Sequence, residues 1–153
     1  MLHVPVLLEE SLGFLLHDLS GTYLDLTFGR GSHSQELLNR ISPQGRLYAV
    51  DRDLEAVSFG KENITDSRFS IYHSNYSEID SLFPRQKFDG ILLDLGTCST
   101  HIDNPKRGFS FQSNGPLDMR MDTSAGFSAA EWLNSATEKE ISDILYQYSD
   151  ERA

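Results

Sequence analysis

Cysteine is almost absent from this chain of 153 residues, in which Cys98 is the single example. A lone cysteine excludes an internal disulfide and a zinc site built from several cysteines. We therefore expect a cytoplasmic protein, because the cytoplasm is reducing and disulfides are rare there. No apolar run approaches the ~18 residues that a membrane-spanning helix needs. A signal peptide is not expected either, because Glu9 and Glu10 interrupt the place where its apolar core should continue.

Basic residues are also scarce, since 13 Lys and Arg oppose 23 Asp and Glu and leave a net charge of −10. Surfaces that bind nucleic acid are normally positive, so a basic groove for RNA must be local or lie outside this chain. Two motifs are missing as well. Without G-x-x-x-x-G-K-[ST] a P-loop ATPase is not expected, and without H-E-x-x-H or a His/Cys cluster we expect no metal site.

Apolar segments and helical periodicities alternate along the first two thirds of the chain. This alternation predicts parallel strands joined by right-handed crossovers, which is an α/β, Rossmann-like architecture. The predicted strands are 22–28, 46–51, 68–73 and 88–94, and the predicted helices are 4–17, 33–41, 53–63 and 78–83.

The pattern changes after residue 94. Residues 95–127 show little periodicity and predict a long loop, which in a compact domain is commonly functional. A capping box of Ser128 and Glu131 predicts the start of a helix, and 137–148 predicts a second amphipathic helix. Only four strands are visible, fewer than this fold normally has, so we expect the front part of a longer protein.

The stretch from Tyr23 to Ser34 reads as a strand, a glycine turn and the first turn of a helix. Gly29 and Gly31 allow a tight turn and a close approach by a ligand, because neither has a Cβ. The free N–H groups of the helix would point back at that ligand. A third glycine, typical of dinucleotide-binding loops, is replaced by Ser34. From this loop alone, a nucleotide-type cofactor site and an ordinary turn both stay open.

Polar residues follow the other predicted strands at their carboxyl ends, where open α/β sheets bind ligands. Asp51 lies about 20 residues beyond the glycines, where a carboxylate accepts hydrogen bonds from ribose hydroxyls, although a helix-capping or solvated acid fits equally well. Tyr76 could stack on a base or be a partly buried core residue. Asp94 is an acid at the sheet edge, followed by a flexible turn at Gly96.

Six longer runs of the sequence are characteristic. They are HVPVLLEE at 3–10, DLTFGRGSHS at 25–34, DRD at 51–53, DGILLDLG at 89–96, RGFSF at 107–111 and GPLDMRMD at 115–122. These runs resemble the MraW family of bacterial small-subunit ribosomal RNA methyltransferases. The resemblance implies a class I methyltransferase fold and an enzyme that uses S-adenosylmethionine to methylate the exocyclic N4 of a cytosine in the decoding centre of 16S rRNA.

The resemblance also assigns parts of the chain. Residues 1–104 would be the cofactor-binding core with the first four strands, and 105–153 the start of a helical insertion that recognises substrate. The family is about twice as long, so its C-terminal remainder would be absent and the fold incomplete. The implied partner is 16S rRNA in the small ribosomal subunit, and a homodimer stays open.

Carried over by motif, the resemblance assigns cofactor-binding residues one by one. The chain departs from the family pattern at three places: Ser32 replaces a glycine, His101 replaces a glutamine, and Thr97-Cys98-Ser99 replaces V-S-S. Asp94 is also our candidate for accepting an N–H bond from the cytosine amine. The implied contacts are Gly31, Ser32 and His33 with the methionine end, Asp51 with the ribose hydroxyls, Tyr76 with the adenine, and Asp94 and His101 with the methionine part and the methyl group.

Two other interpretations stay open. A nicotinamide-dependent oxidoreductase would share the glycine loop and Asp51, but it gives no account of residues 107–122. A truncated product that binds cofactor without catalysing a reaction is also consistent with the sequence, because missing strands would leave apolar faces exposed.

Overall fold

The computed structural model describes residues 7–149. These residues form parts of two compact units, of which the first is Met1–Cys98 and the second Ser99–Ala153. The predicted division into a cofactor-binding core (1–104) and a substrate-recognising insertion (105–153) concerns function, whereas these units are defined by compactness. That functional division stays a prediction. Among the described residues, no helix is both long and apolar enough to cross a membrane.

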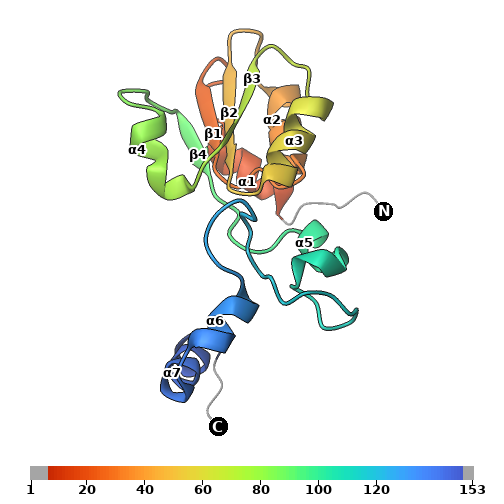
Figure 1. The fold of residues 1–153 in the computed structure, drawn as a ribbon. Coiled ribbons are helices and arrows are strands. Elements are labelled where there is room, and N and C mark those ends of the chain that lie inside the picture. The colour runs from red at the N-terminus through yellow and green to blue at the C-terminus, as the bar shows by residue number, and fades with distance from the viewer. Residues whose placement is uncertain (1–6, 150–153) are drawn as a thin grey trace. The chain divides into compact units, whose positions relative to one another are not determined.

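The first unit is a parallel four-stranded sheet in the order β3-β2-β1-β4, with helices on both faces (Figure 1). This arrangement confirms the predicted α/β, Rossmann-like fold. Its elements are α1 (Leu8–Leu15), β1 (Thr22–Asp25), α2 (Ser32–Arg40), β2 (Arg46–Asp51), α3 (Leu54–Asn63), β3 (Phe69–His73), the 3-10 helix η1 (Tyr76–Glu78), α4 (Ile79–Leu82) and β4 (Gly90–Leu92).

Side chains of the central strands alternate between two apolar layers, because successive residues of a strand point to opposite faces. Tyr23 and Leu47 are fully buried with residues of α1 and α2 on one face. Leu24 and Val50 are buried with residues of α4 on the other. Each such side chain contributes about 1.5–3 kcal/mol on burial. The sheet is thus held from both sides, which fixes the positions of the loops that follow its strands.

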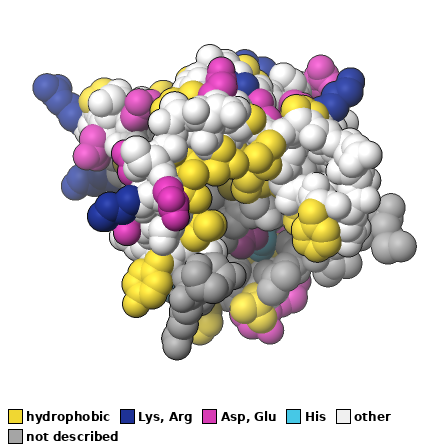
Figure 2. All heavy atoms as spheres, turned by 60° about the horizontal axis from the view of Figure 1, so that its bottom comes forward, with side chains coloured by type: hydrophobic (Ala, Val, Ile, Leu, Met, Phe, Trp, Pro, Cys, Tyr) yellow, Lys and Arg dark blue, Asp and Glu magenta, His cyan; other side chains and the backbone are white. Residues whose placement is uncertain are grey.

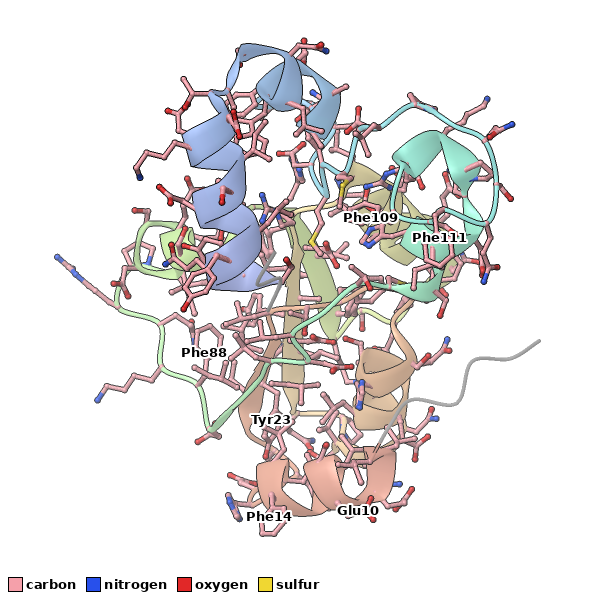
Figure 3. The ribbon with its side chains drawn as sticks, turned by 90° about the horizontal axis from the view of Figure 1, so that it is seen from below. Glu10, Phe14, Tyr23, Phe88, Phe109 and Phe111 are labelled. Atoms are coloured by element: carbon pink, nitrogen blue, oxygen red, sulfur yellow. The ribbon has the colours of Figure 1, made fainter. Side chains whose placement is uncertain are left out.

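Four aromatic rings join α4 to the sheet. The ring centroids of Tyr48 and Phe83 lie 5.4 Å apart, and those of Phe83 and Phe88 lie 5.3 Å apart, both in edge-on arrangements. Tyr72 completes the group, with its centroid 5.4 Å from that of Phe83. Phe88 is labelled in Figure 3. Edge-on pairs add about 0.5–1.5 kcal/mol beyond their buried area, so a helix as short as α4 can still be firmly attached.

Helix α1 is shorter than the predicted helix 4–17, of which residues 4–6 lie outside the described residues. It ends at Leu15 because a turn follows directly, in which the Asp18 carboxylate accepts a hydrogen bond from the Ser20 amide. Leu12 faces the core, whereas Phe14 is 83% exposed and points away from the sheet (Figure 3). The helix therefore covers one end of the sheet with one apolar face only.

The prediction of an uninterrupted loop over 95–127 is wrong, because two short helices of the second unit, at 99–103 and 105–107, occupy part of that range. The capping box of Ser128 and Glu131 is present as predicted, and Thr137 and Glu140 form another. The helices of this unit are α5 (Ser99–Asp103), the 3-10 helix η2 (Pro105–Arg107), α6 (Ala129–Ser135) and α7 (Glu138–Tyr148). The first two are too short to produce a readable periodicity.

The two long family-like runs of the second unit pack against each other. The buried Arg107 side chain donates hydrogen bonds of 3.1 and 2.8 Å to the carbonyls of Arg120 and Met121. A Cβ on Gly115 would lie 2.0 Å from the Pro105 carbonyl oxygen, so a glycine is required there. These runs therefore have a structural role in the second unit.

Candidate functional site

The carboxyl ends of the parallel strands meet at one edge of the sheet. The chain runs outward from β1 through β2 to β3, and then returns to place β4 on the other side of β1. The strand order therefore reverses at β1, and ligands of open α/β sheets bind in the crevice at such a reversal. The loop that follows β1 is the glycine loop, so it lies at the end of the sheet where the strand order reverses.

The glycine loop adopts a conformation that other residues rarely tolerate. Gly29 and Gly31 have φ angles of +55° and +73°. A Cβ on Gly31 would lie 2.5 Å from the Phe28 ring, so this position requires glycine for two reasons. Gly31 is also the N-cap of α2 and has no side chain to cap it. The first N–H groups of α2 therefore receive no capping hydrogen bond from the side chain of the N-cap residue.

Asp51 holds the glycine loop from the end of β2. Its Oδ2 accepts a hydrogen bond of 2.7 Å from the Gly29 amide, and its Oδ1 accepts one of 2.8 Å from the Asp53 amide. The helix cap of α3 is Asp53, not Asp51, because the Asp53 carboxylate accepts from the Glu55 amide. Asp51 therefore joins the glycine loop to the turn that precedes α3.

The buried Asp25 is part of the site and was not predicted from the sequence. It ends β1, is 1% exposed, and accepts a hydrogen bond of 2.7 Å from the Ser34 hydroxyl. Burial raises the pKa of the Asp25 carboxyl, while the bonds from Ser34 and the Thr27 amide oppose that rise. Ser34, where a third glycine was expected, is fully buried and fixes α2 to β1. The signal in the sequence was an acid inside an otherwise apolar strand.

Asp94 lies beyond the end of β4, on the other side of the glycine loop. Its backbone N–H donates a hydrogen bond of 2.7 Å to the Thr27 hydroxyl oxygen, and its side chain is exposed. Thr27 lies two residues before Gly29. The structure therefore joins Asp94 to the loop on the β4 side, as Asp51 is joined to it on the β2 side.

Three other predicted residues of the first unit, Ser32, His33 and Tyr76, follow β1 or β3. Ser32 and His33 form the first turn of α2, directly after Gly31, and His33 is 9% exposed. Tyr76 begins η1 after β3 and is 44% exposed, so it is not a core tyrosine. Because β2 separates β3 from β1, Tyr76 follows a strand that does not adjoin the loop.

His101 belongs to the second unit, unlike the other predicted cofactor residues. It is buried within α5 and stacks on Phe109, with ring centroids 5.2 Å apart. Phe109 is labelled in Figure 3 together with Phe111, which is 99% exposed. The imidazole is therefore held by an aromatic neighbour in its own unit.

Within residues 7–149, no group of three or more His, Cys, Asp or Glu could hold a metal ion. The surface carries exposed apolar side chains beside acidic ones, as Figure 2 shows. Ile91 and Leu93 are among the exposed apolar residues of the chain, with exposed fractions of 46% and 45%. A shallow groove beside the glycine loop is lined by Arg30, Leu54, Glu55, Ser58, Phe59 and Glu62.

Comparison with known proteins identifies the family. The chain is 46% identical over 154 residues to the ribosomal RNA small subunit methyltransferase H of Ruthia magnifica, covering 98% of this chain and 50% of that protein. It is 50% identical over 153 residues to the protein of that name from an Acidovorax species, covering 98% and 49%. The chain thus spans about half the length of the curated relatives that it matches.

A solved structure of a Clostridium thermocellum protein, proposed to be an rRNA methylase, shares the fold. It superposes with a TM-score of 0.53 at 18% identity, covering 63% of this chain and 55% of that one. The sequence model of the MraW methylase family matches residues 1–153. From this match and the close relatives, we conclude that the chain belongs to the MraW methylase family.

Proposed function

We propose that this protein takes part in S-adenosylmethionine-dependent methylation of small-subunit ribosomal RNA, at the exocyclic N4 of a cytosine in the decoding centre. The observation that carries the proposal is the bond between the Gly29 amide and the Asp51 carboxylate at the strand-order reversal, in a chain of the MraW methylase family. Relatives that carry the methyltransferase name match 98% of the chain. Their name supports methylation of small-subunit ribosomal RNA. The choice of the cytosine N4 as the methylated atom goes beyond that name and is our proposal.

The residues at the crevice fit S-adenosylmethionine. Asp51 would hold the two ribose hydroxyls from its place at the end of β2 beside the glycine loop, and the exposed ring of Tyr76 is available for stacking on the adenine. Gly31, Ser32 and His33 would hold the methionine end, since Gly31 brings no Cβ into the crevice and α2 begins there. Asp94 lies on the opposite side of the loop, and His101 of the second unit is the further proposed contact near the methyl group.

When bound, S-adenosylmethionine supplies a methyl group already activated by its positive sulfur. The protein must therefore orient the cytosine amine, which is positioning catalysis. That amine is a poor nucleophile because its lone pair is delocalised into the ring. The Asp94 carboxylate would accept one of its N–H bonds and restore electron density to the nitrogen. The base must also leave its stack to reach the crevice, as in other enzymes that modify bases.

Calorimetric titration tests the cofactor part of the proposal. We expect saturable binding of S-adenosylmethionine by the chain as it stands, and no binding of NADH. Binding of NADH alone would instead support the oxidoreductase interpretation. Tyr146→Phe, an exposed position in the second unit, serves as a matched control that should leave the affinity unchanged.

Transfer of a labelled methyl group to unmodified small ribosomal subunits tests the reaction. We expect N4-methylcytidine after nuclease digestion and mass spectrometry, and loss of the product in Asp94→Ala, which has no acceptor oxygen. A methylated base other than N4-methylcytidine would contradict the proposed atom. Cofactor binding without any transfer would support the interpretation of a binding fragment.

A further inference from the structure

The segment after β1 is held by both neighbouring strands in alternation. The Leu26 amide donates to the Leu92 carbonyl of β4 at 3.0 Å, and the Phe28 amide donates to the Val50 carbonyl of β2 at 3.2 Å. Thr27 lies between these two bonds. A segment attached in this way has little freedom, so the side chain of its middle residue is well placed to fix a neighbour.

Thr27 extends the contact between β1 and β4 beyond the regular ladder. The ladder ends with Asp25 opposite Leu92. Asp94 lies two residues further, where its amide donates a 2.7 Å hydrogen bond to Thr27 Oγ1. A side-chain hydroxyl thus takes the place of a backbone carbonyl as acceptor. This bond attaches the start of the loop after β4 to the segment after β1, while the Asp94 side chain stays exposed.

Thr27 is itself held by the buried pair of Asp25 and Ser34. Its own amide donates a 3.1 Å hydrogen bond to Asp25 Oδ1, and the Ser34 hydroxyl donates a 2.7 Å bond to Asp25 Oδ2. Asp25 and Ser34 are 1% and 0% exposed. A continuous hydrogen-bonded path therefore runs from helix α2 through Asp25 and Thr27 to the backbone of Asp94.

We propose that Thr27 is a positioning residue that sets the place of Asp94 at the methionine and methyl end of the cofactor. The inference rests on the proposed function, in which Asp94 contacts that end and Asp51 the ribose. Thr27 acts through Asp94 on one side of the loop, whereas Asp51 is bound to Gly29 on the other. Removing the Thr27 hydroxyl should therefore affect the methionine end and leave adenosine recognition intact.

The test uses Thr27→Val, which keeps the branched shape and removes the acceptor, and Thr27→Ser, which keeps the hydroxyl. Thr22→Val is the matched control, because Thr22 begins β1 and Thr27 follows the other end of that strand. We expect Thr27→Val to weaken S-adenosylmethionine binding about tenfold, the equivalent of one net hydrogen bond. Adenosine binding should stay within about twofold of the unaltered chain, and Thr27→Ser should restore the cofactor affinity.

Amide hydrogen exchange reports on the bond itself. The Asp94 amide should be protected in the unaltered chain and in Thr27→Ser, and should exchange at least about tenfold faster in Thr27→Val. Unchanged cofactor affinity in Thr27→Val, with binding intact in the unaltered chain, would overturn the inference alone. Equal losses for cofactor and adenosine would also overturn it, because they indicate general damage to the site. Absence of cofactor binding in the unaltered chain would overturn the proposed function and the inference together.

Discussion

The backbone N–H of Gly29 donates a 2.7 Å hydrogen bond to Oδ2 of Asp51, which joins the loop after β1 to the last residue of β2. The same carboxylate accepts from the Asp53 amide at the entrance to α3. One side chain therefore sets the relative positions of two loops at the crevice.

Asp51→Ala should weaken adenosine and S-adenosylmethionine binding by the same factor, about tenfold or more, because both ligands carry the ribose hydroxyls. Asp51→Asn keeps one acceptor oxygen and should lose less. Calorimetric titration with both ligands measures the effect, and Asp80→Asn on the exposed side of α4 is the control. A loss confined to S-adenosylmethionine would contradict the ribose contact.

The main features of the fold follow from local patterns in the sequence. Apolar strands alternating with helices predict a parallel sheet, and the structure has it. Asp51 falls at the end of β2 because strand β2 is strongly apolar and its bounds are sharp. The capping box at Ser128 needs only two residues at a fixed spacing and is found where expected. Such features depend on neighbours in the sequence, and are therefore readable without a structure.

Other parts of the site depend on contacts between distant segments. β1 ends at Asp25 rather than at residue 28, because the Thr27 amide bonds to the Asp25 side chain instead of to a strand. The bond between Ser34 and Asp25 joins a helix to a strand, so the periodicity of neither segment predicts it. The bond between Thr27 and Asp94 spans 67 positions of the chain. These polar contacts form the candidate site, and only the folded structure shows them.

Gly31→Ala should destabilise the protein by about 1–3 kcal/mol, because alanine is strained at a φ of +73° and its Cβ would lie 2.5 Å from the Phe28 ring. Gly13→Ala is the matched control. Gly13 is inside α1 with no atom within 4 Å of an added Cβ, so alanine there should stabilise by about 0.4–1 kcal/mol. Urea unfolding measures both free energies. The prediction is wrong if the two substitutions have effects of the same sign.

The ion pair of Arg68 with Asp66 makes stability depend on acid pH. The Arg68 guanidinium holds the pKa of Asp66 at about 2, below its ordinary value of 3.8. A carboxyl with a depressed folded pKa stabilises the protein above its unfolded pKa, and that contribution is lost as the pH falls from about 4 to about 2. Solvent reaches the pair, so the loss should be at most about 1 kcal/mol.

Asp66→Asn tests this contribution. The variant should be less stable than the unaltered chain at pH 7, and the difference in the free energy of unfolding should shrink toward zero near pH 2. Arg68 also donates hydrogen bonds to the carbonyls of Leu38, Ile41 and Ser42, so these contacts stay in the variant. A difference that is the same at both pH values would contradict the ionic origin.

Asp25 should have the opposite effect to Asp66 on the pH dependence of stability. Burial raises the pKa of its carboxyl above 3.8, so the folded chain keeps the Asp25 proton at pH values where the unfolded chain has released it. Since the folded state then binds more protons, this group lowers stability as the pH rises from about 4 through the raised folded pKa.

The substitution Asp25→Asn removes that charge and keeps an oxygen for the Ser34 hydroxyl. Urea unfolding at pH 4 and pH 8 should therefore show that the stability of the Asp25→Asn variant, relative to the unaltered chain, improves with pH. A relative stability that falls over this interval would show instead that the ionised carboxylate is the better partner for Ser34 and Thr27.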